Sequence, residues 1–278
     1  MDELSLNAYA KINWRLEITG VRTDGYHELD MLMQTISLHD VLCVKKSNEN
    51  KLTVNNVPVE DADSNLVIKA AHALSDYTGE NISASFSLIK NIPSMAGLGG
   101  GSSDCAAALK ALNEMYNLRL STDELMPIAL RLGADVPFFL HSGLCRVRGI
   151  GEQVDRISPA PMANLVIYHV QGGLSTPKVY KKIDEMKLPT RKSGCEAFVK
   201  GLISGKIDSL EPVNDLEPPA IALLPDIAYY KNLLSSHGAL YTLMSGSGSA
   251  VYGVFETEAM AVKASSLMPH SVHSITLS

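Results

Sequence analysis

The chain has 278 residues, of which 46% are apolar and 19% are charged, and its formal net charge is −6. This composition excludes an intrinsically disordered protein, and it argues against a protein that coats nucleic acid, because such binding relies on Lys and Arg to neutralise phosphates. No apolar run approaches the roughly 18 residues that span a bilayer, and the first residues lack the basic and apolar regions of a signal peptide. We therefore expect a soluble cytoplasmic protein with neither a nucleic-acid nor a membrane partner.

The four cysteines are far apart in the sequence, at Cys43, Cys105, Cys145 and Cys195. They form no CxxC pair, and no His lies near them at the spacing of a zinc site. We expect four free and mostly buried thiols rather than disulfides or a metal framework.

The first third of the chain has the pattern of β-strands. Every even position from 4 to 18 is apolar and nearly every odd one is polar, which indicates half-buried strand structure. This alternation predicts that the odd positions, namely Asn7, Lys11, Asn13 and Arg15, project from the face opposite the core. A turn is expected at 20–25, and further strand structure at 29–38 and 41–44.

A glycine-rich segment, 93–103, follows in the sequence PSMAGLGGGSS. A helix predicted over 64–77 and a strand over 82–88 precede it, and an Ala-rich helix over 104–116 follows it. The order strand, glycine loop, helix is typical of a site where backbone N–H groups at a helix N-terminus bind an anion such as a nucleotide phosphate.

Other phosphate-binding patterns do not fit this loop. A Walker A loop requires Gly-Lys-Ser/Thr, and a dinucleotide fingerprint beginning at Gly97 requires glycine at position 102, but Ser102 stands there. The HRD and DFG triplets of protein kinases are absent from the sequence. A flexible Gly/Ser turn remains the structural alternative, although it does not explain the helix signal that follows.

The remaining sequence alternates between helices and strands. Ser121 and Glu124 form a capping-box pattern, Pro127 predicts a kink or a short first turn, Gly133 a helix end, and Asp135 with Pro137 a new helix start. Beyond the prolines at 158–161 we expect strands at 165–170, 239–244, 251–255 and 272–277, and helices opened by 175–177 and at 196–203, 226–236 and 258–268. We therefore predict two α+β domains, 1–157 and 158–278.

Five segments, taken together, resemble the GHMP kinases, and they occur in the order of that family. They are NAYAKIN at 7–13, DGYHEL at 24–29, the glycine loop at 93–103, GADVP at 133–137 and SGSGS at 245–249. The resemblance extends from about residue 4 to about residue 255. It implies an N-terminal ATP-binding domain, a ferredoxin-like C-terminal domain, and the use of ATP and Mg²⁺.

The resemblance also implies a small-molecule substrate and a set of site residues. The substrate would be a methylerythritol linked to cytidine diphosphate, phosphorylated on its 2-hydroxyl. Catalysis would rest on Lys11 and Asp135. Substrate recognition would involve Asn13, Tyr26, His27, Thr176 and Tyr180. The nucleotide would be bound by Asn65 and by Ser94, Met95, Ala96, Gly97, Leu98, Gly99, Gly100, Gly101, Ser102, Ser103 and Asp104. Metal ligands and the oligomeric state are left open.

Each of these roles has a structural alternative. Asp135 fits a helix N-cap, Lys11 a solvated strand position, and the tyrosines and His27 ordinary turn or core packing. At the level of function, the alternatives are another GHMP kinase that acts on mevalonate or homoserine, or a nucleotide-binding homologue without activity. DGYHEL at 24–29 favours the cytidine-bearing substrate, and the presence of Lys11 and Asp135 favours an enzyme.

Overall fold

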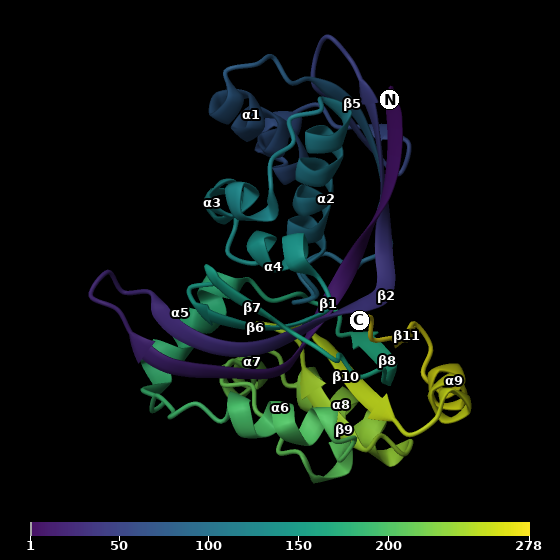
Figure 1. Cartoon of the computed structure of the whole chain (residues 1–278). Helices are drawn as coiled ribbons and strands as arrows, with labels where there is room; N and C mark the ends of the chain where they lie inside the picture. The colour runs from purple at the N-terminus through teal and green to yellow at the C-terminus, as the bar shows by residue number, and fades with distance from the viewer. Residues whose placement is uncertain (1) are drawn as a thin grey trace. The chain divides into compact units, whose positions relative to one another are not determined.

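The computed structural model describes residues 2–278, and the contacts among them define two compact units. Unit 1 contains the chain up to residue 10 together with 38–92 and 99–141, and unit 2 contains 11–37, 93–98 and 142–278. Two long strands, β1 (Glu3–Val21) and β2 (His27–Lys46), pair with each other and pass from one unit into the other (Figure 1). The domain boundary predicted between residues 157 and 158 stays a prediction.

Unit 1 combines part of a sheet with four α-helices. The second half of β2 pairs antiparallel with β5 (Ala84–Ile89), β5 pairs parallel with β3 (Lys51–Val54), and β3 pairs with β4 (Val57–Pro58). The helices are α1 (Leu66–Thr78), α2 (Gly100–Met115), α3 (Thr122–Leu132) and α4 (Val136–His141), and a short 3-10 turn covers Ala62–Ser64.

The helix ends of unit 1 follow the signals in the sequence. The capping box of Ser121 and Glu124 is present at the start of α3, and Pro127 lies inside that helix. The helix α2 begins at Gly100, four residues before the predicted start. The reason is Gly99, whose positive φ of 73° lets the chain turn directly into the helix.

Unit 2 contains a ferredoxin-like sheet, as the family resemblance implies. Its four antiparallel strands lie in the order β11-β8-β10-β9, which is the order 4-1-3-2 of that fold. The strands are β8 (Asn164–His169), β9 (Tyr241–Met244), β10 (Ala250–Phe255) and β11 (Val272–Ile275). In the other, seven-stranded sheet, which also contains β3, β4 and β5, the first half of β2 pairs with β6 (Leu144–Gly149), and β6 pairs with β7 (Gln153–Ile157).

Five helices and a short 3-10 turn complete unit 2. They are α5 (Thr176–Met186), α6 (Cys195–Ile203), the turn Ile207–Ser209, α7 (Glu217–Leu223), α8 (Asp226–Ser236) and α9 (Glu258–Leu267). The helix α8 has the predicted bounds. The helix α7 and the strands β3, β4, β6 and β7 were not predicted, because each is short and has no clear hydrophobic period.

The expectation that the odd positions of β1 project away from the core is wrong for three of the four residues. Lys11 is 3% exposed, Asn13 is 0% exposed and Arg15 is 8% exposed. The even positions are also buried, so from Lys11 to Ile18 β1 is covered on both faces. A buried polar side chain is costly unless it has hydrogen-bond partners, so other segments must supply them.

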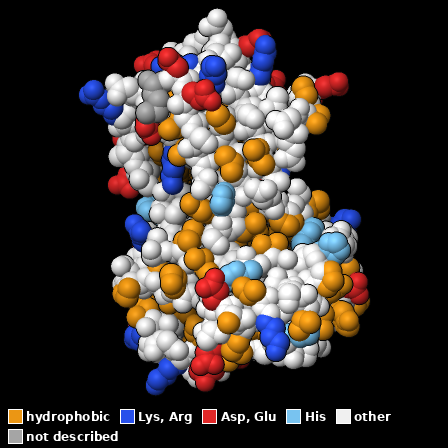
Figure 2. Space-filling model, turned by 90° about the vertical axis from the view of Figure 1, so that its right-hand side faces the viewer, with side chains coloured by type: hydrophobic (Ala, Val, Ile, Leu, Met, Phe, Trp, Pro, Cys, Tyr) orange, Lys and Arg blue, Asp and Glu red, His pale blue; other side chains and the backbone are white. Residues whose placement is uncertain are grey.

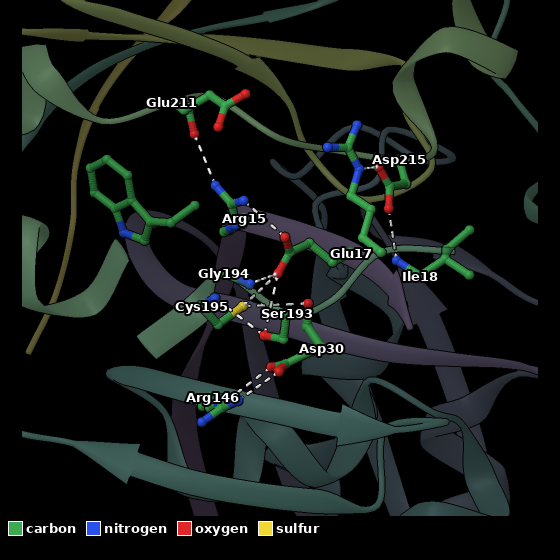
Figure 3. Close-up of polar contacts among 12 residues, drawn as sticks. Arg15, Glu17, Ile18, Asp30, Arg146, Ser193, Gly194, Cys195, Glu211 and Asp215 are labelled. Carbon is green, nitrogen blue, oxygen red and sulfur yellow. Dashed lines mark hydrogen bonds and ion pairs between the residues drawn. The ribbon is translucent and has the colours of Figure 1, made fainter. Parts of the chain in front are cut away.

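Arg15 and Glu17 obtain these partners from the chain around α6 (Figure 3). Arg15 donates to Glu17 Oε1 at 2.8 Å and to the Glu211 carbonyl at 3.1 Å. Glu17 Oε2 accepts from the N–H of Gly194 at 2.9 Å, at the N-terminus of α6. A carboxylate at this end of a helix is favourable because of the helix dipole. The buried face of β1 thereby anchors α6.

A second ion pair lies close to this network in Figure 3. Arg146 on β6 donates two hydrogen bonds to the carboxylate of Asp30 on β2, from Nε at 2.9 Å and from Nη2 at 2.7 Å. Burial by itself would raise the pKa of Asp30, but hydrogen bonds from Arg146 and Ser193 lower it below the ordinary value of 3.8. Asp30 is therefore held in its charged form.

The thiols and the surface agree with the composition. All four cysteines are free, and three of them are buried. No helix in residues 2–278 is long and apolar enough to cross a membrane.

Figure 2 shows charged side chains of both signs scattered over the face in view. Hydrophobic side chains gather in the lower part of this face, on the side where α9 lies in Figure 1. The exposed hydrophobic residues of α9 and β11 include Met260, Val262, Leu267 and Val272.

We predict that Arg146→Met lowers the free energy of unfolding by about 2 kcal/mol at pH 7, because it leaves Asp30 buried without its cation. The folded-state pKa of Asp30 lies below 3.8, so the stability that Arg146 provides is present above 3.8 and is lost as the pH falls through the folded value. Urea unfolding at several pH values should show the difference between variant and wild type narrowing below 3.8. Arg148→Met, on the same strand, removes an exposed pair with Asp155 and should change stability by less than about 1 kcal/mol. An equal loss in both variants would contradict this account.

Candidate active site

The candidate site residues fall in both units. In unit 2, Lys11 and Asn13 lie two residues apart on one face of β1, and Lys11 Nζ donates to Asn13 Oδ1 at 2.7 Å. The same oxygen accepts from the N–H of Gly246 at 3.0 Å. A Cβ added at Gly246 would lie 3.0 Å from Lys11 Nζ. The loop at 245–249 is thus in direct contact with Lys11, which the sequence did not reveal.

The first half of the glycine loop packs on the same loop. Gly97 has a φ of 75°, and a Cβ at this position would lie 2.1 Å from the Ser245 carbonyl oxygen. Ser245 Oγ donates to the Gly97 carbonyl at 2.9 Å, and the Lys11 N–H donates to the Leu98 carbonyl at 3.0 Å. Only glycine permits this approach. Lys11, the first half of the glycine loop and the second glycine turn therefore form one contiguous cluster within unit 2.

The residues assigned to base recognition lie on β2 and α5, also in unit 2. The rings of His27 and Tyr180 have their centroids 5.1 Å apart at an angle of 32°. His27 Nε2 lies 3.1 Å from Asp184 Oδ1. Tyr26 is exposed, and Thr176 Oγ1 lies 2.8 Å from Ser247 Oγ in the second glycine turn. The structure brings His27 and Tyr180 together and links Thr176 to the loop beside Lys11.

The second half of the glycine loop forms the N-terminus of α2 in unit 1. The backbone N–H groups of its first turn have no partner within the helix, as at every helix start. Ser103 is buried, and its Oγ donates to the Tyr9 carbonyl at 2.7 Å. Gly101 is exposed, and a Cβ there would meet only Leu66 Cδ1 at 3.9 Å. The start of α2 thus lies beside the start of α1 and has open backbone on its surface.

Asn65 and Asp135 stand at two neighbouring helix starts of unit 1. Asn65 caps α1, with its Oδ1 accepting from the Val67 N–H at 2.9 Å. Asp135 is half-buried and immediately precedes α4. A Cβ at Gly133, two residues earlier, would lie 3.9 Å from Ser102 Oγ. The turn that carries Asp135 therefore adjoins the first turn of α2.

Asp104 does not present its side chain to the surface, although it was assigned to nucleotide binding. Its carboxylate is buried and accepts from Lys90 Nζ at 2.7 Å, while Lys90 also binds Asp40. Burial raises the pKa of Asp104 to about 7, and Lys90 opposes this shift. Asp40 in turn accepts from the Ile92 N–H at 2.8 Å. This buried cluster ties the first turns of α2 to the strands β2 and β5. Asp104 therefore supports the second half of the glycine loop from inside unit 1.

Sequence reasoning did not identify several residues that shape the site. Asn214 Nδ2 donates to the carbonyls of Met244 and Gly246 at 2.8 Å each and so holds the second glycine turn. Lys90 and Asp40 support α2, and Asp184 contacts His27. These residues lie far in sequence from the groups they hold. Only Asp184, one helical turn after Tyr180, had a local signal, because side chains at i and i+4 share one face of a helix.

The donor set suits a nucleotide phosphate better than a protein-bound metal ion. Glycines with open backbone stand at the α2 N-terminus, and backbone of this kind can bind an anion. Within residues 2–278 there is no group of three or more His, Cys, Asp or Glu side chains that could hold a metal ion. A magnesium ion in such a site takes most of its ligands from phosphate oxygens and water.

Family models match both parts of the chain. The model of the GHMP kinases N terminal domain matches residues 65–143, and that of the GHMP kinases C terminal region matches residues 198–268. The first match covers α1, the whole glycine loop and the turn with Asp135.

Curated relatives match over nearly the whole length. A 4-diphosphocytidyl-2-C-methyl-D-erythritol kinase from Caldicellulosiruptor bescii is 36% identical over 99% of this chain and 97% of its own. The kinase of the same name from Desulfitobacterium hafniense is 39% identical over 94% and 90%. A crystal structure titled 4-(cytidine 5′-diphospho)-2C-methyl-D-erythritol kinase has a TM-score of 0.84 and 32% identity, covering 99% of this chain and all of its own.

A homoserine kinase from Cytophaga hutchinsonii has the same fold at lower similarity. Its TM-score is 0.73 at 18% identity, with 100% of this chain and 95% of that chain covered. At this identity the likeness concerns the fold alone.

Two glycine substitutions should separate packing from phosphate binding. Gly97→Ala places a methyl group against the Ser245 carbonyl at positive φ and should lower the free energy of unfolding by about 1–3 kcal/mol. Gly101→Ala lies in a helix with space around it and should leave the free energy of unfolding unchanged or raise it by up to about 1 kcal/mol. If Gly101 borders the nucleotide, this variant still weakens ATP binding. Thermal unfolding and ATP titration measure the two effects, and unchanged ATP affinity in Gly101→Ala would remove Gly101 from the site.

Proposed function

Because the chain belongs to the GHMP kinase family and is related over its full length to 4-diphosphocytidyl-2-C-methyl-D-erythritol kinases, we propose that it carries out their reaction. In that reaction, the γ-phosphoryl group of ATP is transferred to the 2-hydroxyl of 4-diphosphocytidyl-2-C-methyl-D-erythritol. The chain is thus an alcohol kinase in the production of isoprenoid precursors. The observation that carries the proposal is the contact of Lys11 and Asn13 with the loop 245–249, against which Gly97 packs.

The glycine loop has the chemistry to bind the phosphates of ATP. Phosphoryl transfer requires little covalent help from a protein and much positioning and charge stabilisation. The N–H groups at the start of α2, supported by the dipole of that helix, can position the phosphates and stabilise their charge without a cationic surface. The pair of Lys90 and Asp104 keeps this helix start in place.

Lys11 and Asp135 are the residues to which we assign catalysis. Asp135 would accept or orient the proton of the attacking hydroxyl. Lys11 would place positive charge at the transferred phosphoryl group. Lys11 is buried on a strand, with its ammonium held by Asn13. This supports the role, because burying an ammonium group costs free energy, and a site that binds phosphate gives a reason to keep one there.

The substrate assignment is supported by the two rings beside β2. Tyr180 and His27 offer a flat apolar face and ring nitrogens, which suit a pyrimidine base. Mevalonate and homoserine contain no base, so in the alternative kinases this pair of rings would have no base to recognise. Asn13 is assigned to the substrate hydroxyls, Tyr26 to stacking on the base opposite Tyr180, and Thr176 to a further substrate contact.

Magnesium is proposed as the metal ion that accompanies ATP. When bound, it would neutralise charge on the β- and γ-phosphates. Asp135 and the hydroxyls of Ser102 and Ser103 are the oxygen groups near the start of α2, and Ser103 is already committed to the Tyr9 carbonyl. We therefore expect phosphate oxygens and water to supply most of its ligands.

Substitution of either catalytic residue should abolish most of the turnover. Asp135→Asn and Lys11→Met are each expected to lower kcat by at least about a hundredfold, because a proton acceptor or a phosphoryl-stabilising charge is lost. Lys51→Met, which removes an exposed lysine, is the control and should keep wild-type kcat. Steady-state kinetics and circular dichroism test this assignment together. A folded Asp135→Asn or Lys11→Met protein with near-normal turnover would contradict it.

The substrate can be tested with the wild-type protein. We expect ATP consumption in the presence of Mg²⁺ with 4-diphosphocytidyl-2-C-methyl-D-erythritol and none above background with mevalonate or homoserine. A coupled assay for ADP measures all three. Phosphorylation of mevalonate or homoserine would establish one of the alternative kinases, and the absence of turnover with any of them would favour a nucleotide-binding protein without activity.

A further inference from the structure

The side chain of His27 is enclosed on two sides by α5. One side is covered by the ring of Tyr180, and Nε2 lies 3.1 Å from Asp184 Oδ1. The His27 side chain is only 8% exposed, whereas that of Asp184 is 65% exposed. The two ring nitrogens of His27 thus have different surroundings, and the carboxylate stands at one of them.

The arrangement is built into α5. Tyr180 and Asp184 are four residues apart and therefore lie on the same face of the helix, one turn from each other. Beyond the C-terminus of α5, the Arg191 N–H donates to the Ile18 carbonyl at 2.8 Å, and Glu17 holds Gly194. The segment that follows α5 is therefore tied to β1.

A carboxylate accepts hydrogen bonds and does not donate them. Its contact with Nε2 therefore requires that the proton of the neutral imidazole is on Nε2, which leaves Nδ1 with a lone pair. We propose that Asp184 is a positioning residue that fixes His27 in this tautomer, so that Nδ1 is left as the acceptor for the cytosine amino group that the proposed function assigns to His27. This inference rests on the proposed function, since it concerns the base of the same substrate.

Cytosine and uracil differ in the group that would face Nδ1 of His27. Cytosine has an amino group at C4, which can donate to Nδ1, whereas uracil has a carbonyl oxygen there, which would face the same lone pair. With the proton on Nδ1 instead, His27 would donate to the uracil oxygen equally well. Specificity by a fixed hydrogen-bond acceptor is effective because the wrong partner leaves buried polar groups unpaired.

If Asp184 has a purely structural role, the expected effect of removing it is different. Ion pairs with an exposed partner contribute little to stability, so loss of this one should leave the fold intact. If the contact were only a surface pair, its removal would change neither the tautomer of His27 nor the preference between bases.

The first test measures the tautomer in the full-length protein without substrate. Long-range proton–nitrogen correlation spectra of ¹⁵N-histidine-labelled protein, with His27 assigned through His27→Gln, should show Nε2 protonated and Nδ1 not. In Asp184→Ala the two tautomers should both be populated. Glu185→Ala, which removes the next carboxylate on α5, is the matched control and should leave the spectrum unchanged. A wild-type ring protonated on Nδ1 or on both nitrogens, or no change in Asp184→Ala, would overturn the proposal.

The second test measures selectivity. The ratio of kcat/KM for the cytidine substrate to that for its uridine analogue should fall by roughly tenfold or more in Asp184→Ala, mainly through KM, with kcat for the cytidine substrate kept. Asp184→Asn, whose amide can both donate and accept, should lie between. An unchanged ratio in Asp184→Ala would refute the proposal. If wild-type protein phosphorylates neither compound, the proposed function itself fails, while the tautomer experiment still decides the role of Asp184.

Discussion

The requirement that buried polar groups be hydrogen-bonded determines much of the structure of unit 2. From Lys11 to Glu17, every second residue of β1 is polar and buried. Each of these side chains must find a partner, because the strand has no access to water there. The loop at 245–249 supplies one to Asn13, the start of α6 supplies one to Glu17, and the chain at Glu211 supplies one to Arg15. A single strand thus organises three distant segments.

β1 also carries Lys11 and Asn13, to which the proposed function assigns roles in catalysis and substrate binding. Lys11 and Asn13 belong to the row of buried polar residues that continues with Arg15 and Glu17. Lys11 is fixed because the residues after it on β1 are fixed, and the loop it contacts is itself held by Asn214. A lysine positioned in this way loses little conformational entropy during the reaction. The negative net charge of the protein is therefore compatible with phosphate-bearing substrates, since the local geometry supplies the few positive groups that are needed.

The candidate site also combines groups of different burial. The glycine loop is exposed at Gly101 and packed at Gly97, and buried Asp104 with Lys90 supports the start of α2. His27 instead depends on α5, where it contacts the ring of Tyr180 and the exposed carboxylate of Asp184. In the proposed function, phosphate binding thus depends on backbone packing, whereas base recognition depends on side chains that one substitution can alter without disturbing the core.

The sequence by itself determined most of the longer elements and the position of the glycine loop, because these depend on local periodicity, caps and turn residues. It also indicated the family through five short segments, and that resemblance implied the ferredoxin-like arrangement. It failed for the polar face of β1, since alternation shows that two faces differ but not whether a later part of the chain covers the second one. The partners of Lys11, Asp104 and His27, namely Asn13 with Gly246, Lys90 and Asp184, became visible only in the tertiary structure. Most of these contacts join residues far apart in the chain, and such pairings are decided by packing rather than by local sequence.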